Sequence, residues 1–380
     1  MTDLLRLRPA ATPEMMAVFD DVATIAHACA FEVALARAQA AHGLIPDAVA
    51  RTIAEGVESA RIDPAALAEE AALAGTLAIP LVRRLRAQLT GEAAQVLHRG
   101  ATSQDVADSV LMMQVRAAHP VLVIDARRVV AALVRQAETY RATPAVGRTL
   151  LQDAMPVAFG LRLAQAAAGI ADALEHLEAA VARHAVIQFG GAAGTRAGLN
   201  GQGAAVAAHM ADAMGLGTGA PWHARRTGIA AIGAGLGLLI GALGKLARDV
   251  SLLAQNRIGE AQEPVVAGRG GSSAMAHKRN PTGCQVALSA AVRAPGLVAS
   301  LLAGMPQEQE RGLGGWQAEG PVIAELFLLA SGSAAAMAVV AEGLAIDGAA
   351  IARNLAAAGM GEEIGESAAI IAELLGIEGD

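Results

Sequence analysis

Long apolar runs and short polar islands alternate along this chain. In the runs, alanine, leucine, valine and glycine recur at helical spacing, whereas the alternation typical of strands is nearly absent. The best candidate for a strand, residues 185–189, is short. Helices are predicted over residues 13–42, in short pieces over 46–90, and over 106–140, 155–184, 227–249, 282–304 and 320–345.

Capping and helix-breaking residues mark several of these helices. Thr12 and Pro13 are typical of an N-cap followed by a first helical turn. Gly43 is a typical end of the helix that begins there. We expect a bend at Pro120 and a kink at Pro295, because proline removes a backbone donor inside a helix.

One apolar run is long enough to resemble a membrane span. Residues 227–244 carry no charge, but glycines at positions 233, 235, 237, 241 and 244 interrupt them, and Lys245, Arg248 and Asp249 continue the helical pattern. A helix that is apolar on all sides is also what the centre of a large bundle or oligomer requires. We expect a soluble, buried helix here, with a membrane helix as the alternative.

Composition narrows the classes of function. Hydrophobic residues make up 54% of the 380 residues and aromatic residues only 2%, which suits closely packed helices better than a β-sandwich. The formal net charge of −7 argues against nucleic-acid binding. A local cluster of basic groups must therefore attract any anionic substrate.

Cysteine and histidine usage bears on metals, cofactors and compartment. Cys29 and Cys284 are too few for a disulfide framework or a cysteine-rich zinc site, and they fit a reducing cytoplasm. The nine histidines show no metal-ligand spacing, and residues 190–194 lack the glycine spacing of a dinucleotide site. With Asp3 early and no apolar segment after it, the N-terminus does not resemble a signal peptide. We expect no metal, no cofactor and a cytoplasmic location.

The most distinctive polar island is residues 270–281, GGSSAMAHKRNP. Its glycines let a ligand approach the main chain, and its two serines supply hydroxyl groups. Lys278 and Arg279 favour a carboxylate or phosphate. A solvated basic loop between helices is the simpler interpretation of such a composition. Two further islands are residues 98–105, HRGATSQD, and residues 147–152, GRTLLQ.

The spacing G-S-S-x-M-x-x-K-x-N-P in residues 271–281 resembles the signature loop of the fumarase/aspartase superfamily. The His-Lys-Arg before its Asn-Pro is most similar to the 3-carboxy-cis,cis-muconate cycloisomerase branch. Residues 98–105 and 147–156 resemble the other two conserved regions of the superfamily. The resemblance extends from about residue 5 to about residue 355.

This resemblance implies an all-α protein with a long central helical bundle, a smaller N-terminal helical domain and a shortened C-terminal helical region. We expect these parts at residues 108–348, 1–107 and 349–380, respectively. The resemblance also implies a homotetramer in which each active site is assembled from three subunits. The expected ligand is a small polycarboxylate, with no nucleic-acid or membrane partner.

The superfamily reaction, by resemblance, moves a proton on the carbon next to a carboxylate while a neighbouring group leaves or attacks. The doubly charged intermediate needs hydrogen-bond donors and cations where its charge develops. Ser272 corresponds to the loop serine that acts as carbon acid or base, and Lys278 joins it in the expected catalytic set. The residues expected to bind substrate are His98, Thr102, Ser103, Gln104, Arg148, Thr149, Gln152, Ser273, Met275, Asn280 and Arg311.

The second conserved region departs from the superfamily pattern. Most superfamily lyases place a general-acid histidine where this chain has Leu150, and many place another where it has Asp153. Expelling an amine or hydroxide needs a proton donor. Lactonisation does not, because the group that attacks, and that leaves in reverse, is a weakly basic carboxylate. The departure therefore favours a cycloisomerase over amine or hydroxide elimination.

The expected function is closure of 3-carboxy-cis,cis-muconate to 4-carboxymuconolactone, in the protocatechuate branch of aromatic degradation. Two alternatives stay open: a superfamily lyase of the adenylosuccinate-lyase kind acting on another polycarboxylate, and a non-catalytic structural descendant. The intact set of Ser272, Lys278 and Asn280 argues against the second. A general-acid role for His98 or His277 also stays open.

Overall fold

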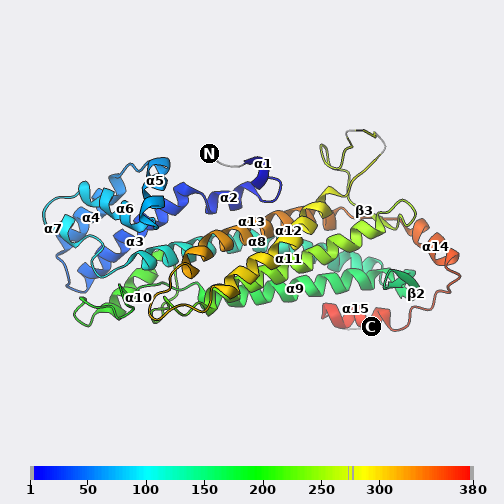
Figure 1. The fold of residues 1–380 in the computed structure, drawn as a ribbon. Helices are drawn as coiled ribbons and strands as arrows, with labels where there is room; N and C mark the ends of the chain where they lie inside the picture. Colours follow the sequence, from blue (N-terminus) through cyan, green and yellow to red (C-terminus); the bar gives the residue numbers. More distant parts are fainter. Residues whose placement is uncertain (1–3, 273, 276–277, 377–380) are drawn as a thin grey trace.

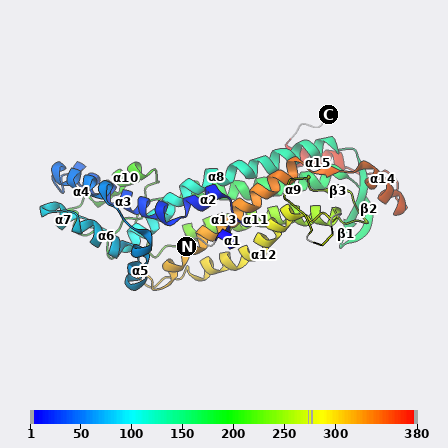
Figure 2. The ribbon, with the colours of Figure 1, turned by 90° about the horizontal axis from the view of Figure 1, so that it is seen from above.

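The computed structural model describes residues 4–272, 274–275 and 278–376. Most of these residues are helical and the strands are few and short, so the expected all-α fold is confirmed. Five long helices lie side by side along the axis of the molecule (Figures 1 and 2). They are α8 (Ser103–Thr139), α9 (Phe159–His184), α11 (Thr227–Leu253), α12 (Thr282–Ala303) and α13 (Gly315–Glu342).

Shorter helices surround this bundle. The N-terminal part contributes α1 (Leu4–Leu7), α2 (Pro13–Val18), α3 (Asp21–Ala41), α4 (Asp47–Ser59), α5 (Pro64–Ala74), α6 (Ala78–Ala87) and α7 (Gly91–Val96). Helices α3 to α7 gather at the left end in Figure 1, where α10 (Gly203–Met214) packs against α3. At the opposite end, α14 (Gly348–Ala357) contacts the first strand and α15 (Ser367–Leu375) packs on α9.

The first predicted long helix is in fact two. It breaks at Phe19, and α3 begins after Asp20, whose carboxylate accepts a hydrogen bond from the Ala23 amide at 2.7 Å. Aspartate is a favoured N-cap, so the new start has a local cause. Helix α8 continues through Pro120 and helix α12 continues through Pro295, as the predicted helices over these residues require.

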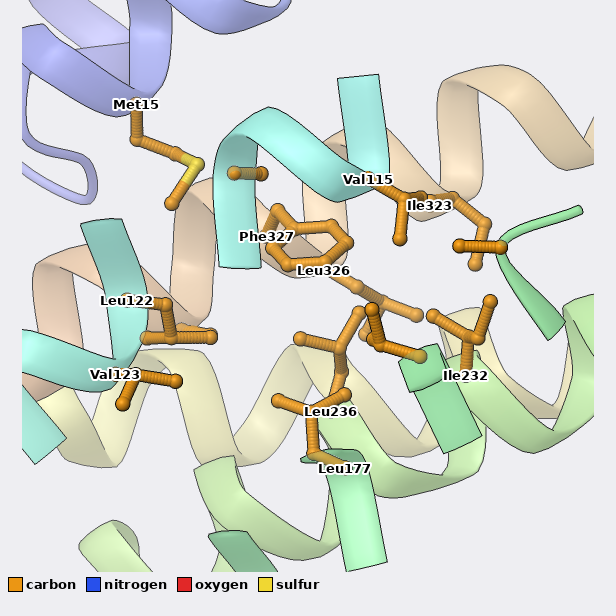
Figure 3. Close-up of a cluster of buried hydrophobic side chains, with 14 of the residues drawn as sticks. Met15, Val115, Leu122, Val123, Leu177, Ile232, Leu236, Ile323, Leu326 and Phe327 are labelled. Atoms are coloured by element: carbon orange, nitrogen blue, oxygen red, sulfur yellow. The ribbon is translucent and has the colours of Figure 1, made fainter. Parts of the chain in front are cut away.

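The bundle core is built from aliphatic side chains that are almost fully buried (Figure 3). Ile232 and Leu236 of α11 lie near Leu326 of α13, and these three side chains have no exposed surface. The neighbouring Phe327 is also fully buried and packs against Phe19, with the ring centroids 5.7 Å apart. Glycine lets the helices approach closely: a Cβ at Gly233 would lie 2.1 Å from Leu301 Cδ1. The glycines that interrupt residues 227–244 thus include sites of tight helix packing.

Three bundle helices, α11, α12 and α13, are long and apolar enough to cross a membrane by length and composition. In their most apolar stretches, 61% of α11 and 67% of α13 is buried inside the protein. Packing within the bundle therefore accounts for their apolar character. Only 22% of the corresponding stretch of α12 is buried, so this helix presents apolar residues outward.

The chain contains a β-hairpin that its sequence pattern did not predict. Strands β1 (Pro144–Thr149) and β2 (Gln152–Ala158) pair antiparallel across a two-residue turn, while β3 (Ala261–Gln262) pairs with β4 (Ala345–Ile346). Residues 185–189, the predicted strand, form only an isolated bridge between Val186 and Gly217. The turn residues Leu150 and Leu151 adopt φ of 52° and 65°. Because such turns usually use Asn or Gly, two leucines gave no signal for one.

Candidate active site

The three polar islands lie at two opposite ends of the bundle. The first begins α8, and the second lies on the hairpin that follows the end of α8. A 37-residue helix is about 55 Å long at 1.5 Å per residue. The loop of residues 270–281, here called the signature loop, lies between β3 and the start of α12, at the hairpin end of the molecule (Figure 1).

At the end of the bundle where α8 begins, three of the predicted substrate-binding residues contact one another. Arg311, in the connection between α12 and α13, donates from Nη1 to Thr102 Oγ1 at 2.7 Å. Its Nη2 donates to Ser103 Oγ at 3.3 Å. The two hydroxyl groups stand at the N-terminus of α8, where the helix dipole also favours an anion. We call this the Arg311 cluster, and all three side chains are partly exposed.

Gln104 lies beneath this cluster rather than on its surface. Its side chain is fully buried and donates to the His223 carbonyl at 2.9 Å and to Asp108 at 3.2 Å. The next residue, Asp105, is buried too and accepts from the backbone amides of Gly190 and Gly191, both at 2.9 Å. These bonds hold the first turn of α8 against the glycine-rich connection before α10.

His98 is held by an acidic residue that sequence reasoning missed. Its Nδ1 lies 2.7 Å from Oε1 of Glu32, a fully buried carboxylate on α3. Burial lowers the pKa of His98, but the Glu32 hydrogen bond and charge, with the Asp105 charge, outweigh it and raise the pKa overall. The one signal in the sequence was a lone acid, Glu32, inside an apolar run.

At the other end, Arg148 of β1 is bound to a buried carboxylate. Its Nη2 and Nη1 donate to Glu260 at 2.6 and 3.1 Å, and Arg162 and Asn354 also donate to Glu260. Burial opposes the ionised form of Glu260, but the Arg148 and Asn354 hydrogen bonds and the arginine charges lower its pKa overall. Asp153, where relatives place a histidine, lies 3.4 Å from Arg148 Nε.

The tip of the hairpin is exposed. Thr149 pairs with Gln152 across the turn, and both side chains face solvent. Between them Leu150 is 96% exposed and Leu151 is 77% exposed. The tip therefore presents apolar groups, and no proton donor, at the position of the missing histidine.

The signature loop is closed by its own backbone. Asn280 donates from its amide to the Gly270 carbonyl at 2.9 Å and from Nδ2 to the Gly271 carbonyl at 3.2 Å. Gly270 has φ of +76°, and a Cβ there would lie 2.8 Å from the Asn280 carbonyl oxygen. Glycine is thus required at the closure point, for both its conformation and its size.

Ser272 lies in this closed loop with its oxygen facing backbone donors. Its Oγ accepts hydrogen bonds from the amides of Met275 at 3.1 Å and Ala274 at 3.3 Å. Two such donors stabilise negative charge on an oxygen, which is what a serine acting as carbon acid or base requires. Ser273 and His277 lie outside the described residues.

A cleft of about 730 Å³ opens beside the loop. Met275, Lys278 and Asn280 of the loop line it together with Glu263 and Arg269, whereas Ser272 is not among its lining residues. In the described part of the chain Lys278 makes no ion pair, so its charge is available to a ligand. The described residues contain no group of three His, Cys, Asp or Glu side chains suited to a metal ion.

One chain therefore assembles two partial sites. The first comprises the Arg311 cluster with His98 nearby, and the second comprises the signature loop and its cleft. The hairpin of Arg148, Thr149 and Gln152 lies at the same end of the molecule as the loop, but none of these three residues lines the cleft. The bundle length separates these two groups, so a substrate bound at one end does not reach the other within a single protomer.

The chain is similar to known lyases and cycloisomerases. A family model described as Lyase matches residues 8–296. The 3-carboxy-cis,cis-muconate cycloisomerase of Bradyrhizobium diazoefficiens is 45% identical over 345 residues, covering 90% of this chain and 76% of the relative. The nitrosuccinate lyase of Streptomyces davaonensis is 40% identical over 380 residues, covering 97% of this chain and 80% of the relative.

A solved structure is similar along nearly the whole chain. The 3-carboxy-cis,cis-muconate lactonizing enzyme from Pseudomonas putida superimposes with a TM-score of 0.87 at 39% sequence identity. The match covers 93% of this chain and 79% of that one.

Proposed function

The chain belongs to the lyase family of the fumarase/aspartase superfamily, and on that premise we propose that it closes 3-carboxy-cis,cis-muconate to 4-carboxymuconolactone. The observation that carries this assignment is the 45% identity to a cycloisomerase over 90% of the chain. We place the activity in the cytoplasm and in the protocatechuate branch of aromatic degradation, without metal or cofactor.

In the proposed reaction, a carboxylate oxygen of the substrate adds to a carbon of the neighbouring double bond. The electron pair of that bond moves toward the adjacent carboxylate and forms the aci-carboxylate. Ser272 Oγ then gives its proton to the α-carbon, and the C–H bond completes the lactone. The resulting alkoxide is stabilised by the Met275 and Ala274 amides and by the positive charge of Lys278.

The hairpin tip fits this chemistry. Cyclisation does not expel a strongly basic group, so no proton donor is needed at Leu150. The exposed Leu150 offers only apolar contact, and Asp153 is paired with Arg148.

A second candidate function follows from the nitrosuccinate lyase relative, whose match covers 97% of this chain. A nitro group leaves a carbon as nitrite, which is also a weakly basic anion. Elimination of nitrite therefore needs no general acid at position 150 either. A lyase that releases nitrite is thus the specific form in which we consider the alternative of a lyase on another polycarboxylate.

Substrate selectivity tests the assignment. We expect purified protein to remove the diene absorbance of 3-carboxy-cis,cis-muconate, and to show no measurable cleavage of malate, adenylosuccinate or argininosuccinate, whose leaving groups need protonation. Ultraviolet assays of this panel, with nitrite release from nitrosuccinate measured in parallel, check it. Nitrite release without loss of diene absorbance would replace the cycloisomerase by the lyase.

We further propose that the protein is a homotetramer with shared active sites. Two features support this. The signature loop and the Arg311 cluster lie at opposite ends of one bundle, and α12 leaves most of its apolar stretch uncovered, including Val292 at 78% exposure. An apolar face of this kind is unfavourable in water, and contact between copies of the chain would bury it.

Light scattering should therefore give four times the chain mass of 38.3 kDa at micromolar concentration. Val292→Asp should dissociate the assembly and abolish turnover, because a charge buried between apolar helices is strongly unfavourable. A stable, active monomer would overturn both the tetramer and the shared site. Extraction only with detergent would instead favour a membrane position for α12.

A further inference from the structure

The buried carboxylate of Glu32 contacts His98, and the reaction proposed above does not use this contact. Glu32 is fully buried in the middle of α3, where one acid among apolar residues is costly. One carboxylate oxygen, Oε1, binds His98 Nδ1, while Oε2 is buried with no hydrogen-bond partner among the described residues. The one group that the Glu32 carboxylate binds among the described residues is thus the imidazole of His98, which its charge stabilises in the protonated form.

The backbone at His98 is also constrained. Its φ is +67°, an uncommon conformation for a non-glycine residue, and it precedes Gly100 with φ of +82°. The Ala101 amide bonds back to the His98 carbonyl at 3.3 Å, which closes a tight turn directly before Thr102. On the other side of this turn, Gln39 of α3 donates to the Arg99 carbonyl at 2.6 Å.

These contacts leave one edge of the imidazole for a ligand. Because Nδ1 binds Glu32, only Nε2 is left for a ligand, and it has no protein partner in the described chain. The His98 side chain is 18% exposed to solvent. Nε2 is also not fully buried, unlike Nδ1 of His223. The open edge belongs to the turn that leads into the Arg311 cluster.

We propose that Glu32 is a positioning residue that holds His98 as a cationic contact for a substrate carboxylate beside the Arg311 cluster. This inference rests on the proposed function for the identity of the substrate. Glu32 orients the ring through Nδ1 and supplies the negative charge that keeps it protonated, so that Nε2–H donates to the carboxylate. His98 then contributes to substrate binding, and Ser272 contributes the proton.

The charges around His98 set the direction of the pH dependence. Glu32 on α3 and Asp105 on α8 favour the charged imidazole, while Arg86 on α6 and burial disfavour it. Binding should therefore be strongest at low pH and weaken as pH rises through the pKa of His98. Glu32→Gln removes the largest favourable contribution and moves this loss of affinity to lower pH.

Binding of propane-1,2,3-tricarboxylate, measured by calorimetry across pH, tests the proposal without requiring turnover. Glu32→Gln should weaken binding about tenfold at neutral pH, and Glu32→Asp should restore most of it. With muconate substrate, Glu32→Gln should raise KM while kcat changes little. The matched control is Glu58→Gln, which removes an acid from the exposed Arg37 pair and should change neither value.

A double-mutant cycle separates positioning from simple support of the fold. If Glu32 acts through His98, then Glu32→Gln combined with His98→Gln should bind no more weakly than His98→Gln alone. That double variant removes both charges together, so it stays informative if Glu32→Gln fails to fold. Additive losses, or Glu32→Gln with unchanged affinity and pH dependence, would overturn the proposal. Intact binding effects without muconate turnover would overturn the proposed function instead.

Discussion

Replacing Ser272 by alanine is expected to lower kcat about a thousandfold, within the range for general acid–base groups. The hydroxyl is the proposed proton donor to carbon, and its oxygen accepts the Met275 and Ala274 amides that would stabilise the alkoxide. The loop should remain closed in the variant, because Asn280 bonds the Gly270 and Gly271 carbonyls without the serine. Steady-state kinetics should therefore show a loss in kcat with a modest change in KM.

Ser273→Ala is the matched control for that experiment. It removes the neighbouring hydroxyl from the same loop and should cost much less activity than Ser272→Ala. His98→Gln should act mainly on KM, whereas His277→Gln tests the remaining histidine of the signature loop. A larger loss in kcat for Ser273→Ala than for Ser272→Ala would show that the carbon acid is Ser273. A loss in kcat for either histidine variant as large as that for Ser272→Ala would show that a general acid operates after all.

Replacing Arg226 by methionine is expected to destabilise the fold by about 3–5 kcal/mol, because it leaves buried carboxylates without their cation. Arg226 is 1% exposed and donates from Nη1 and Nη2 to Asp108, both at 2.8 Å. Its Nε donates to Glu319 at 3.0 Å. This network joins α8 and α13 to the residue directly before α11, beneath the Arg311 cluster.

The pH dependence of this loss has a defined sign. Burial raises the pKa of both Asp108 and Glu319, even with Arg226 present. A carboxyl with a raised pKa in the folded state costs no stability once it is protonated, and its cost appears as pH rises through that pKa. The difference in the free energy of unfolding between Arg226→Met and the wild type should therefore become smaller as pH falls.

Arg37→Met is the control for the Arg226 experiment. Arg37 pairs with Glu58, and the two side chains are 59% and 63% exposed, so the loss of this pair should cost less than about 1 kcal/mol. Denaturant unfolding at one fixed protein concentration measures both variants, since assembly makes stability depend on concentration. Equal losses for the two arginines would contradict the buried-charge explanation.

The sequence by itself determined the helical character of the protein and the chemistry of its polar islands. Apolar spacing, the Thr12 and Pro13 start, and the signature loop are local properties, since each depends on neighbouring residues alone. They were sufficient for the all-α fold and for the family. The same reasoning missed the hairpin, because strand pairing between residues 144–149 and 152–158 arises from contacts across a turn whose two leucines carry no turn signal.

Only the tertiary structure decided which charged groups meet. Arg148 reaches Glu260 across 112 positions, and His98 reaches Glu32 across 66. Such pairs depend on how helices pack, and no spacing along the chain encodes them. The same holds for the distance between the two partial sites. The three polar islands are recognisable in the sequence, but their positions at opposite ends of the bundle depend on the length of α8 and the order of the bundle helices. A rigid helix keeps its two ends apart.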